Sequence, residues 1–226
     1  MKELDFTRVI AMLAVITIHV TSTYITRHSN TLILGMNLAF LLNQVTRFAV
    51  PLFILVSGVS LGLKGESGSF GAFLRGRLVK IGIPYAVWSA LYLLYQNHSD
   101  LSALSVRSVF RTFLLGQAAP HLYFIVIIFQ LYLLVPLLKR WVKRAPCASL
   151  LGSFLISYGI QKLFYFLKYD VDWIPDLIRP YLWMLFPTWI FYFVLGLLLT
   201  GPRLAGLQKL ASRNSVTILL ATFAFA

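Results

Sequence analysis

Six stretches of this sequence are apolar enough and long enough to cross a lipid bilayer, and they decide the fold class. A helix needs about 20 residues to cross the hydrocarbon layer, and a chain that is 59% hydrophobic and 12% charged has lipid as its main solvent. A seventh run, Val216 to Ala226, is too short, so we expect a fragment of a longer protein. We predict one all-α, multi-pass membrane domain over residues 1–226, with six complete spans and a truncated seventh. The six are Phe6 to Ile25, Leu38 to Leu63, Val79 to Gln96, Leu122 to Leu138, Leu150 to Leu167 and Tyr181 to Leu199.

The basic residues predict the orientation of these spans. Of the twenty lysines and arginines, five fall in loops on one side and two inside spans, which leaves thirteen on the side of the N-terminus. Cytosolic loops carry the excess of Lys and Arg, so we expect a cytosolic N-terminus. This bias also accounts for the net charge of +13 without nucleic acid. Glu3 and Asp5 precede the first run and no cleavage site follows it, so that run is expected to stay as a membrane anchor.

The first span carries two ionisable residues that lie eleven positions apart, Arg8 and His19. At 100° per residue both side chains project from one helix face, about 16 Å apart along the axis, and Asp5 joins the same stripe. Charged groups inside spans are costly and mark cavities or pathways. The alternative is that Arg8 extends to the cytosolic headgroups and His19 is a packing residue.

A cytosolic loop from Lys64 to Lys80 ends in three cations, Arg75, Arg77 and Lys80. Guanidinium groups bind phosphate through paired hydrogen bonds, so this cluster is a candidate phosphate site. The alternative is the ordinary positive charge of cytosolic loops.

The remaining polar positions give weaker signals. Arg47 is a second charge within a span, and His121 starts the fourth span after a proline. We take both as substrate-binding candidates, although His121 also fits a helix-start residue. The outer loop from Asn97 to Pro120 contains an amphipathic stretch that suits an interfacial helix or, equally well, a lid over an outward cavity.

Other residues are assigned to packing or to no site. Gly58 and Gly62 form a G-x-x-x-G pattern that predicts close helix packing. The aromatic residues Trp88, Tyr92 and Tyr95 could stack on a sugar, but helical spacing of this kind is more often found in packing residues, and they are not assigned to a site. The four histidines and the single cysteine, Cys147, lack ligand spacing, so no metal site and no intrachain disulfide are predicted.

Several of these stretches resemble the acyltransferase 3 family of membrane proteins. "LDFTRVIAMLAVITIH" is similar to the family's first helix, with its arginine and histidine at Arg8 and His19, and "VPLFILVSG" to its second. "FLRGRLVKIGIPYAVWS" resembles the basic segment that enters the third helix, with Lys80 where a second arginine is common. "HLYFIVIIFQLYLLVPLL" resembles a later aromatic helix start, with Tyr123 where tryptophan is usual.

The resemblance implies a fold of about ten spans and a transferase activity. It implies transfer of an acyl group, often acetyl, from cytosolic acyl-coenzyme A to a hydroxyl of an extracytoplasmic sugar or polysaccharide at a bacterial cytoplasmic membrane. No bound cofactor is implied, because acyl-coenzyme A is the donor substrate. Arg8 would join Arg75, Arg77 and Lys80 on the donor's phosphates, and His19 would act as general base or transient acyl carrier. The alternative is an exporter of polysaccharide or lipid-linked sugar, in which Arg8, Arg47 and His19 line a pathway without chemistry.

Overall fold

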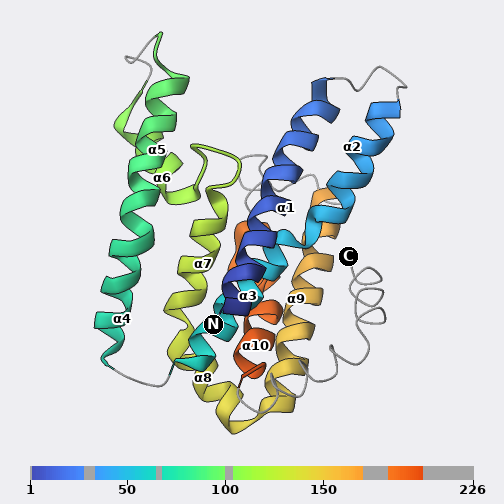
Figure 1. Cartoon of the computed structure of the whole chain (residues 1–226). Helices are drawn as coiled ribbons and strands as arrows, with labels where there is room; N and C mark the ends of the chain where they lie inside the picture. The colour runs from blue at the N-terminus through green and yellow to red at the C-terminus, as the bar shows by residue number, and fades with distance from the viewer. Residues whose placement is uncertain (1, 28–33, 65–67, 100–103, 170–182, 201–226) are drawn as a thin grey trace. The chain divides into compact units, whose positions relative to one another are not determined.

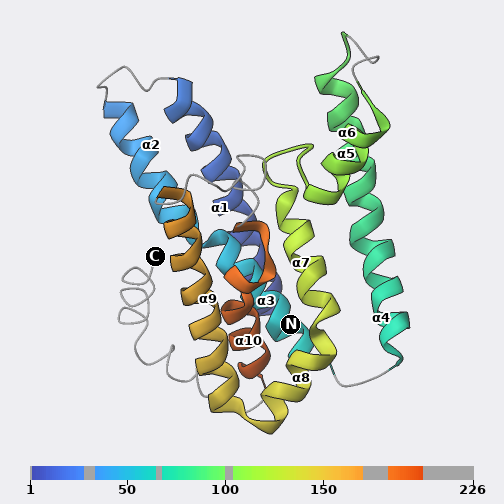
Figure 2. The same cartoon turned by 180° about the vertical axis from the view of Figure 1, so that it is seen from behind.

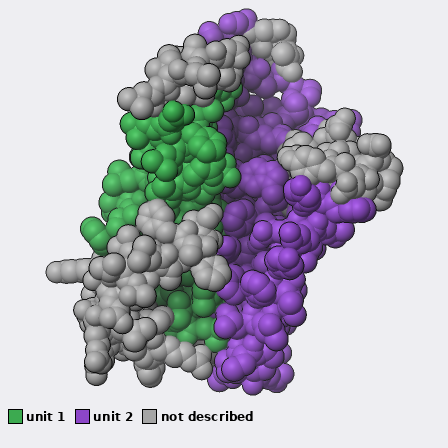
Figure 3. Space-filling model, turned by 90° about the vertical axis from the view of Figure 1, so that its right-hand side faces the viewer, with its two compact units in different colours: residues 1–65, 195–226 green, residues 66–194 purple. Residues whose placement is uncertain are grey.

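The structure is a computed structural model that describes residues 2–27, 34–64, 68–99, 104–169 and 183–200. Every regular element in these ranges is helical. The chain divides into two compact units, one made of Met1–Gly65 with Leu195–Ala226 and one made of Glu66–Val194 (Figure 3). Each unit is described by itself.

The first unit is built on two helices that lie side by side in both views (Figures 1 and 2), followed by a third. The elements are α1 (Lys2–Arg27), α2 (Leu34–Val45), the 3₁₀ turn η1 (Thr46–Phe48) and α3 (Ala49–Leu63). Pro51 explains the 3₁₀ turn, since proline has no N–H to donate to the carbonyl of Arg47 and its ring crowds that carbonyl. The chain tightens at η1 and then resumes as α3.

Glycines bring α3 close to the end of α10 (Ile190–Leu198) inside the first unit. A Cβ added at Gly62 would lie 2.4 Å from Thr200 Cγ2, and one at Gly196 would lie 2.2 Å from the carbonyl oxygen of Leu55 and 3.0 Å from Gly58 Cα. Small residues of this kind let helix backbones approach in a membrane. The close packing predicted from Gly58 and Gly62 is therefore confirmed.

The second unit contains most of the remaining helices. A helix that starts at Phe70 passes through three segments, and α7 is beside it in Figures 1 and 2. The elements of the unit in chain order are α4 (Phe70–Arg77), the π-helical segment η2 (Leu78–Gly82), α5 (Ile83–Gln96), α6 (Val106–Leu115), α7 (Tyr123–Leu133), α8 (Val135–Arg144), α9 (Pro146–Tyr169), the 3₁₀ turn η5 (Phe186–Thr188) and the start of α10.

Proline explains the irregular segments of this unit as well. Pro84 cannot donate to Lys80, and the preceding turn widens so that the N–H of Ile83 bonds to the carbonyl of Leu78, five residues back. Between α7 and α8 the axis bends by 57°, at the position where Pro136 removes another helical donor.

The turn η5 interrupts what the sequence predicts as the start of a span, and side chains replace its lost backbone hydrogen bonds. Gln130 of α7 donates to the carbonyl of Met184 (3.1 Å) and accepts from the N–H of Phe186 (3.0 Å). Ser157 of α9 donates to the carbonyl of Pro187 at 3.0 Å. Irregular backbone at membrane depth persists where neighbouring helices satisfy it in this way.

The all-helical fold class is confirmed for the described residues. They contain four helices of spanning length and composition, or five if the bent pair α7 and α8 counts as one span. These correspond to the first five predicted spans, and the third is longer than predicted because it starts at Phe70. The basic cluster is therefore helical rather than part of a loop. The predicted span from Tyr181 lies partly, and the run from Val216 wholly, outside the described residues, so that part stays a prediction.

Candidate functional site

The first unit holds Arg8 in a defined position through two hydrogen bonds. Its Nη1 donates to Asp5 Oδ1 at 2.5 Å, and its Nη2 donates to Ser60 Oγ of α3 at 2.6 Å. Asp5 is one turn before Arg8, so helix geometry alone brings the two side chains within reach of each other. The Arg8 side chain is 43% exposed, which leaves it accessible to an anionic ligand. The sequence places Asp5 on the same helix face as Arg8, whereas the contribution of Ser60 is found only in the structure.

His19 lies on the same helix as Arg8, and its side chain is partly buried. Eleven residues of α-helix separate them, so the one-face arrangement and the spacing of about 16 Å follow from the unbroken α1. Arg47 lies in η1 of the same unit and is exposed.

A buried amide joins α1 to α2 beside His19. Asn43 is 7% exposed, and its Nδ2 lies within 3.3 Å of the Ile18 carbonyl, 3.1 Å of Thr21 Oγ1 and 2.8 Å of Ser22 Oγ. These three acceptors flank His19 in the sequence. The contact fixes the rotation of α1 against α2 at the turn that carries His19. Asn43 escaped the sequence analysis, although a lone amide inside an apolar run is a signal for helix association.

In the second unit the basic cluster separates into different environments. The Arg77 guanidinium lies over two aromatic rings, with its Cζ 5.3 Å from the centre of Phe73 and 4.9 Å from the centre of Tyr132. Arg75 and Lys80 are exposed. Cation–π contacts use the face of a guanidinium and leave its N–H edge available for phosphate oxygens. The aromatic clamp therefore orients Arg77 without neutralising it.

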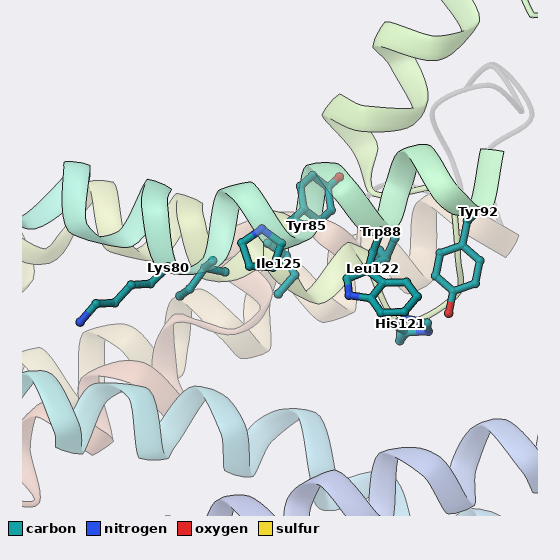
Figure 4. A pocket seen from close by; sticks show the side chains of 9 residues that line it. Lys80, Tyr85, Trp88, Tyr92, His121, Leu122 and Ile125 are labelled. Atoms are coloured by element: carbon teal, nitrogen blue, oxygen red, sulfur yellow. The ribbon is translucent and has the colours of Figure 1, made fainter. Parts of the chain in front are cut away.

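A groove of about 460 Å³ runs along α5 in the second unit. Figure 4 shows Lys80 at one end and Tyr92 with His121 at the other. From Lys80 to Tyr92 is twelve residues of helix, about 18 Å. The groove has nine lining residues, which are Lys80, Ile81, Pro84, Tyr85, Trp88, Tyr92, His121, Leu122 and Ile125.

The groove brings together Lys80 and His121, for which the sequence predicts different roles, in donor binding and in substrate binding. It also takes in Trp88 and Tyr92, whose helical spacing favours packing. Positions 81, 84, 85, 88 and 92 recur at intervals of one, three or four, so they share a helix face. The sequence shows this periodicity. It does not show whether the face packs into a core or lines a groove.

His121 lies in the turn before α7 with its ring edge against Tyr92, the ring centres 5.6 Å apart. Partial burial lowers the pKa of the His121 imidazole below its ordinary value, because desolvation disfavours the charged form. The ring is therefore neutral at pH 7 and offers one donor and one acceptor nitrogen. Such a ring suits a neutral hydroxyl better than a cation or an aliphatic chain.

Comparison with known proteins adds a family to this geometry. The acyltransferase domain model of the acyltransferase 3 family matches residues 1–226. A protein of Bacillus subtilis (strain 168) named as a membrane-bound acyltransferase, YfiQ, is 23% identical over 198 residues, which is 86% of this chain and 55% of that protein. The chain thus spans about half the length of this curated relative. No solved structure matches the chain.

Proposed function

Because the chain belongs to the acyltransferase 3 family, as its motifs predicted, we propose that it moves an acyl group from cytosolic acyl-coenzyme A to a hydroxyl of an extracytoplasmic sugar or polysaccharide. Acetyl is the acyl group we propose. The protein would do this in a bacterial cytoplasmic membrane with its N-terminus in the cytosol. The family and the apolar helices support a membrane acyltransferase, and the donor, the acceptor and the orientation are the steps added here.

One observation carries the proposal: a single unbroken helix presents Arg8 and His19 on one face. The two side chains are about 16 Å apart along the axis, roughly half of the hydrocarbon thickness. A cation near the cytosolic surface and an imidazole deeper in the membrane suit a donor that is anionic at one end and reactive at the other.

The donor's phosphates would contact Arg8 and the cluster of Arg75, Arg77 and Lys80. Arg8 is held by Asp5 and Ser60 and Arg77 by Phe73 and Tyr132, so these guanidinium groups would bind with little loss of side-chain freedom. Arg8 and the cluster belong to different units, and their joint action is part of the proposal.

The chemistry assigned to His19 is general base catalysis. Its neutral ring would take the proton from the acceptor hydroxyl while the oxygen attacks the thioester carbonyl carbon. The carbon–sulfur bond then breaks, and coenzyme A leaves as a thiolate that takes up a proton. Transient acylation of the ring is the other route that an imidazole offers. Arg47 and His121 would contact the acceptor.

The test is transfer from radiolabelled acetyl-coenzyme A to envelope glycan in membranes that carry the complete gene product. We expect His19→Ala to lower transfer by at least about 100-fold, the usual contribution of a general base. His98→Ala is the matched control, because His98 is exposed and its Nδ1 lies 2.8 Å from the carbonyl oxygen of Tyr95.

Each outcome of this assay has a distinct meaning. Loss in His19→Ala with retention in His98→Ala supports the enzyme and the role of His19. Transfer retained in both variants removes His19 from the chemistry. Absence of transfer by the wild type, with glycan movement across the membrane, would replace the enzyme by the exporter.

A further inference from the structure

The groove along α5 has Lys80 at one end and aromatic residues with an imidazole at the other. We call the end away from Lys80 the outer half. Trp88 is 56% exposed, and its ring centre is 6.1 Å from that of Tyr92 at an angle of 38°. His121 meets Tyr92 edge to face. Figure 4 shows these three side chains close together at the end away from Lys80. Two aromatic faces and one imidazole therefore border the same space.

The walls of this outer half are fixed to one another. Gln96 of α5 donates to the carbonyl of Ala118 at 2.9 Å, which ties the helix to the turn that carries His121. Beneath the groove, Ala118, Ala119 and Leu122 form a buried cluster against which Tyr92 packs. The site is thus largely formed before any ligand arrives, as small-molecule sites usually are.

The turn itself is tightly constrained at Gly116. This residue has a positive φ of 65°, and a Cβ at this position would lie 2.7 Å from Tyr123 Cα. Only glycine fits both conditions. The placement of His121 therefore follows from a turn that has little freedom to rearrange.

The charges on the groove indicate the class of ligand. Lys80 is the one lysine, arginine or acidic residue among the described residues that line it, and it lies about 12 Å along the helix from Trp88. The imidazole beside Tyr92 is neutral at pH 7. An anion would find no cationic partner among the described residues of the outer half, whereas a ligand with an apolar face and hydroxyl edges would find two aromatic faces and an imidazole that can form a hydrogen bond.

We propose that Trp88, Tyr92 and His121 form the binding subsite for a neutral pyranose ring of the acceptor. The apolar C–H face of the ring would lie on Trp88 and Tyr92, and a ring hydroxyl would bond to His121. A pocket of about 460 Å³ lies within the range of about 300–1,000 Å³ for small-molecule sites. This subsite rests on the proposed function, since it names where that function's acceptor binds. A membrane lipid chain is the competing occupant, but an aliphatic chain has no hydroxyl to hydrogen-bond to an imidazole.

The first measurement separates acceptor binding from donor binding in the transfer assay. We expect Trp88→Ala to raise KM for the acceptor about tenfold, the loss of one stacking face, with KM for acetyl-coenzyme A unchanged. Trp88→Phe keeps an aromatic face and should restore most of the affinity. Tyr95→Ala is the matched control, because Tyr95 lies on the same helix, is 77% exposed and stacks on His98 outside the groove. An unchanged acceptor KM in Trp88→Ala would overturn the proposal.

The second measurement does not depend on activity. Hydroxyl-radical footprinting of the wild type in nanodiscs, read residue by residue by mass spectrometry, is compared with and without methyl glycosides of neutral hexoses. Protection of Trp88 by the sugar, with Trp141 and Trp189 unchanged as internal references, supports the subsite even if no transfer is found. No protection of Trp88 by the sugar would overturn the subsite and assign the surface to the bilayer, while leaving the transferase proposal intact.

Discussion

The side chains of Arg8 and Arg77 are held in place by different kinds of partner. Arg8 uses two guanidinium nitrogens on a carboxylate and a hydroxyl, whereas Arg77 uses its face on two aromatic rings. Lysine has no planar fork and cannot reproduce either arrangement. Replacement of these arginines by lysine would keep the charge and lose the orientation.

His121 provides a pH test at the residue scale. Burial lowers its pKa in the folded state below the value of 6.5, while the unfolded chain keeps the ordinary value. Well above pH 6.5 the ring is neutral in both states and has no effect on pH dependence. As the pH falls below 6.5 the unfolded state takes up the proton first, so the free energy of unfolding decreases until the folded pKa is passed.

We therefore expect the wild type to lose more thermal stability than His121→Gln between pH 7.5 and pH 5.5. The measurement is the melting temperature of both proteins in the same detergent at the two pH values. An equal loss in both proteins would mean that the folded and unfolded pKa of His121 coincide. His98→Gln controls for removing an exposed histidine.

At the scale of elements, prolines account for the breaks in the helices, and glycines allow neighbouring helices to approach closely. Pro51, Pro84 and Pro136 each remove a helical donor, and a 3₁₀ turn, a π-helical turn and a bend of 57° are found at these places. Gly196 lets α10 approach α3 within the first unit.

Gly196→Ala should destabilise the protein. Its Cβ would lie 2.2 Å from the Leu55 carbonyl oxygen and 2.9 Å from the Val59 nitrogen, and backbone atoms cannot move aside as a side-chain tip can. Overpacking of this kind costs about 1–3 kcal/mol. The measurement is the free energy of unfolding in mixed micelles. Gly159→Ala is the control, because nothing lies within 4 Å of its Cβ, and it should gain up to about 1 kcal/mol from helix propensity. Equal behaviour of the two variants would contradict the close approach.

At the scale of the whole molecule, the distribution of basic residues predicts the orientation, and that prediction has a direct test. Cys147 is the single cysteine of the chain and is exposed, on the side predicted to be cytosolic. A membrane-impermeant maleimide should label it in inside-out vesicles and leave it unlabelled in intact cells.

The control reverses the pattern in the same protein. With Cys147→Ser and Ser99→Cys, the cysteine lies in the loop predicted to be outside, and labelling should occur in intact cells. The inverse result for both cysteines would invert the topology. The basic cluster would then face away from the cytosolic donor, and the proposed role of Arg75 and Lys80 would fall with it.

Contacts within one helix could be predicted from the sequence. The period of 3.6 residues places Asp5, Arg8 and His19 on one face without knowledge of any neighbour, and Asp5 and Arg8 do form a pair. The apolar runs likewise predicted the helices that have the length and composition of membrane spans. Close packing at Gly58 and Gly62 followed from the small side chains alone.

Contacts between helices could not be predicted in this way. Ser60 beside Arg8, Asn43 beside Ile18 and Tyr132 beside Arg77 are separated in sequence by 52, 25 and 55 positions, and no local rule selects such partners. The same limit applies to Trp88 and Tyr92, whose spacing fits a core as well as a groove. The sequence by itself determined a helical membrane protein of a known family and the face that carries Arg8 and His19, because these depend on hydrophobicity and helix period. Only the tertiary structure decided what each polar group contacts and where the groove lies, because these depend on how separate helices pack.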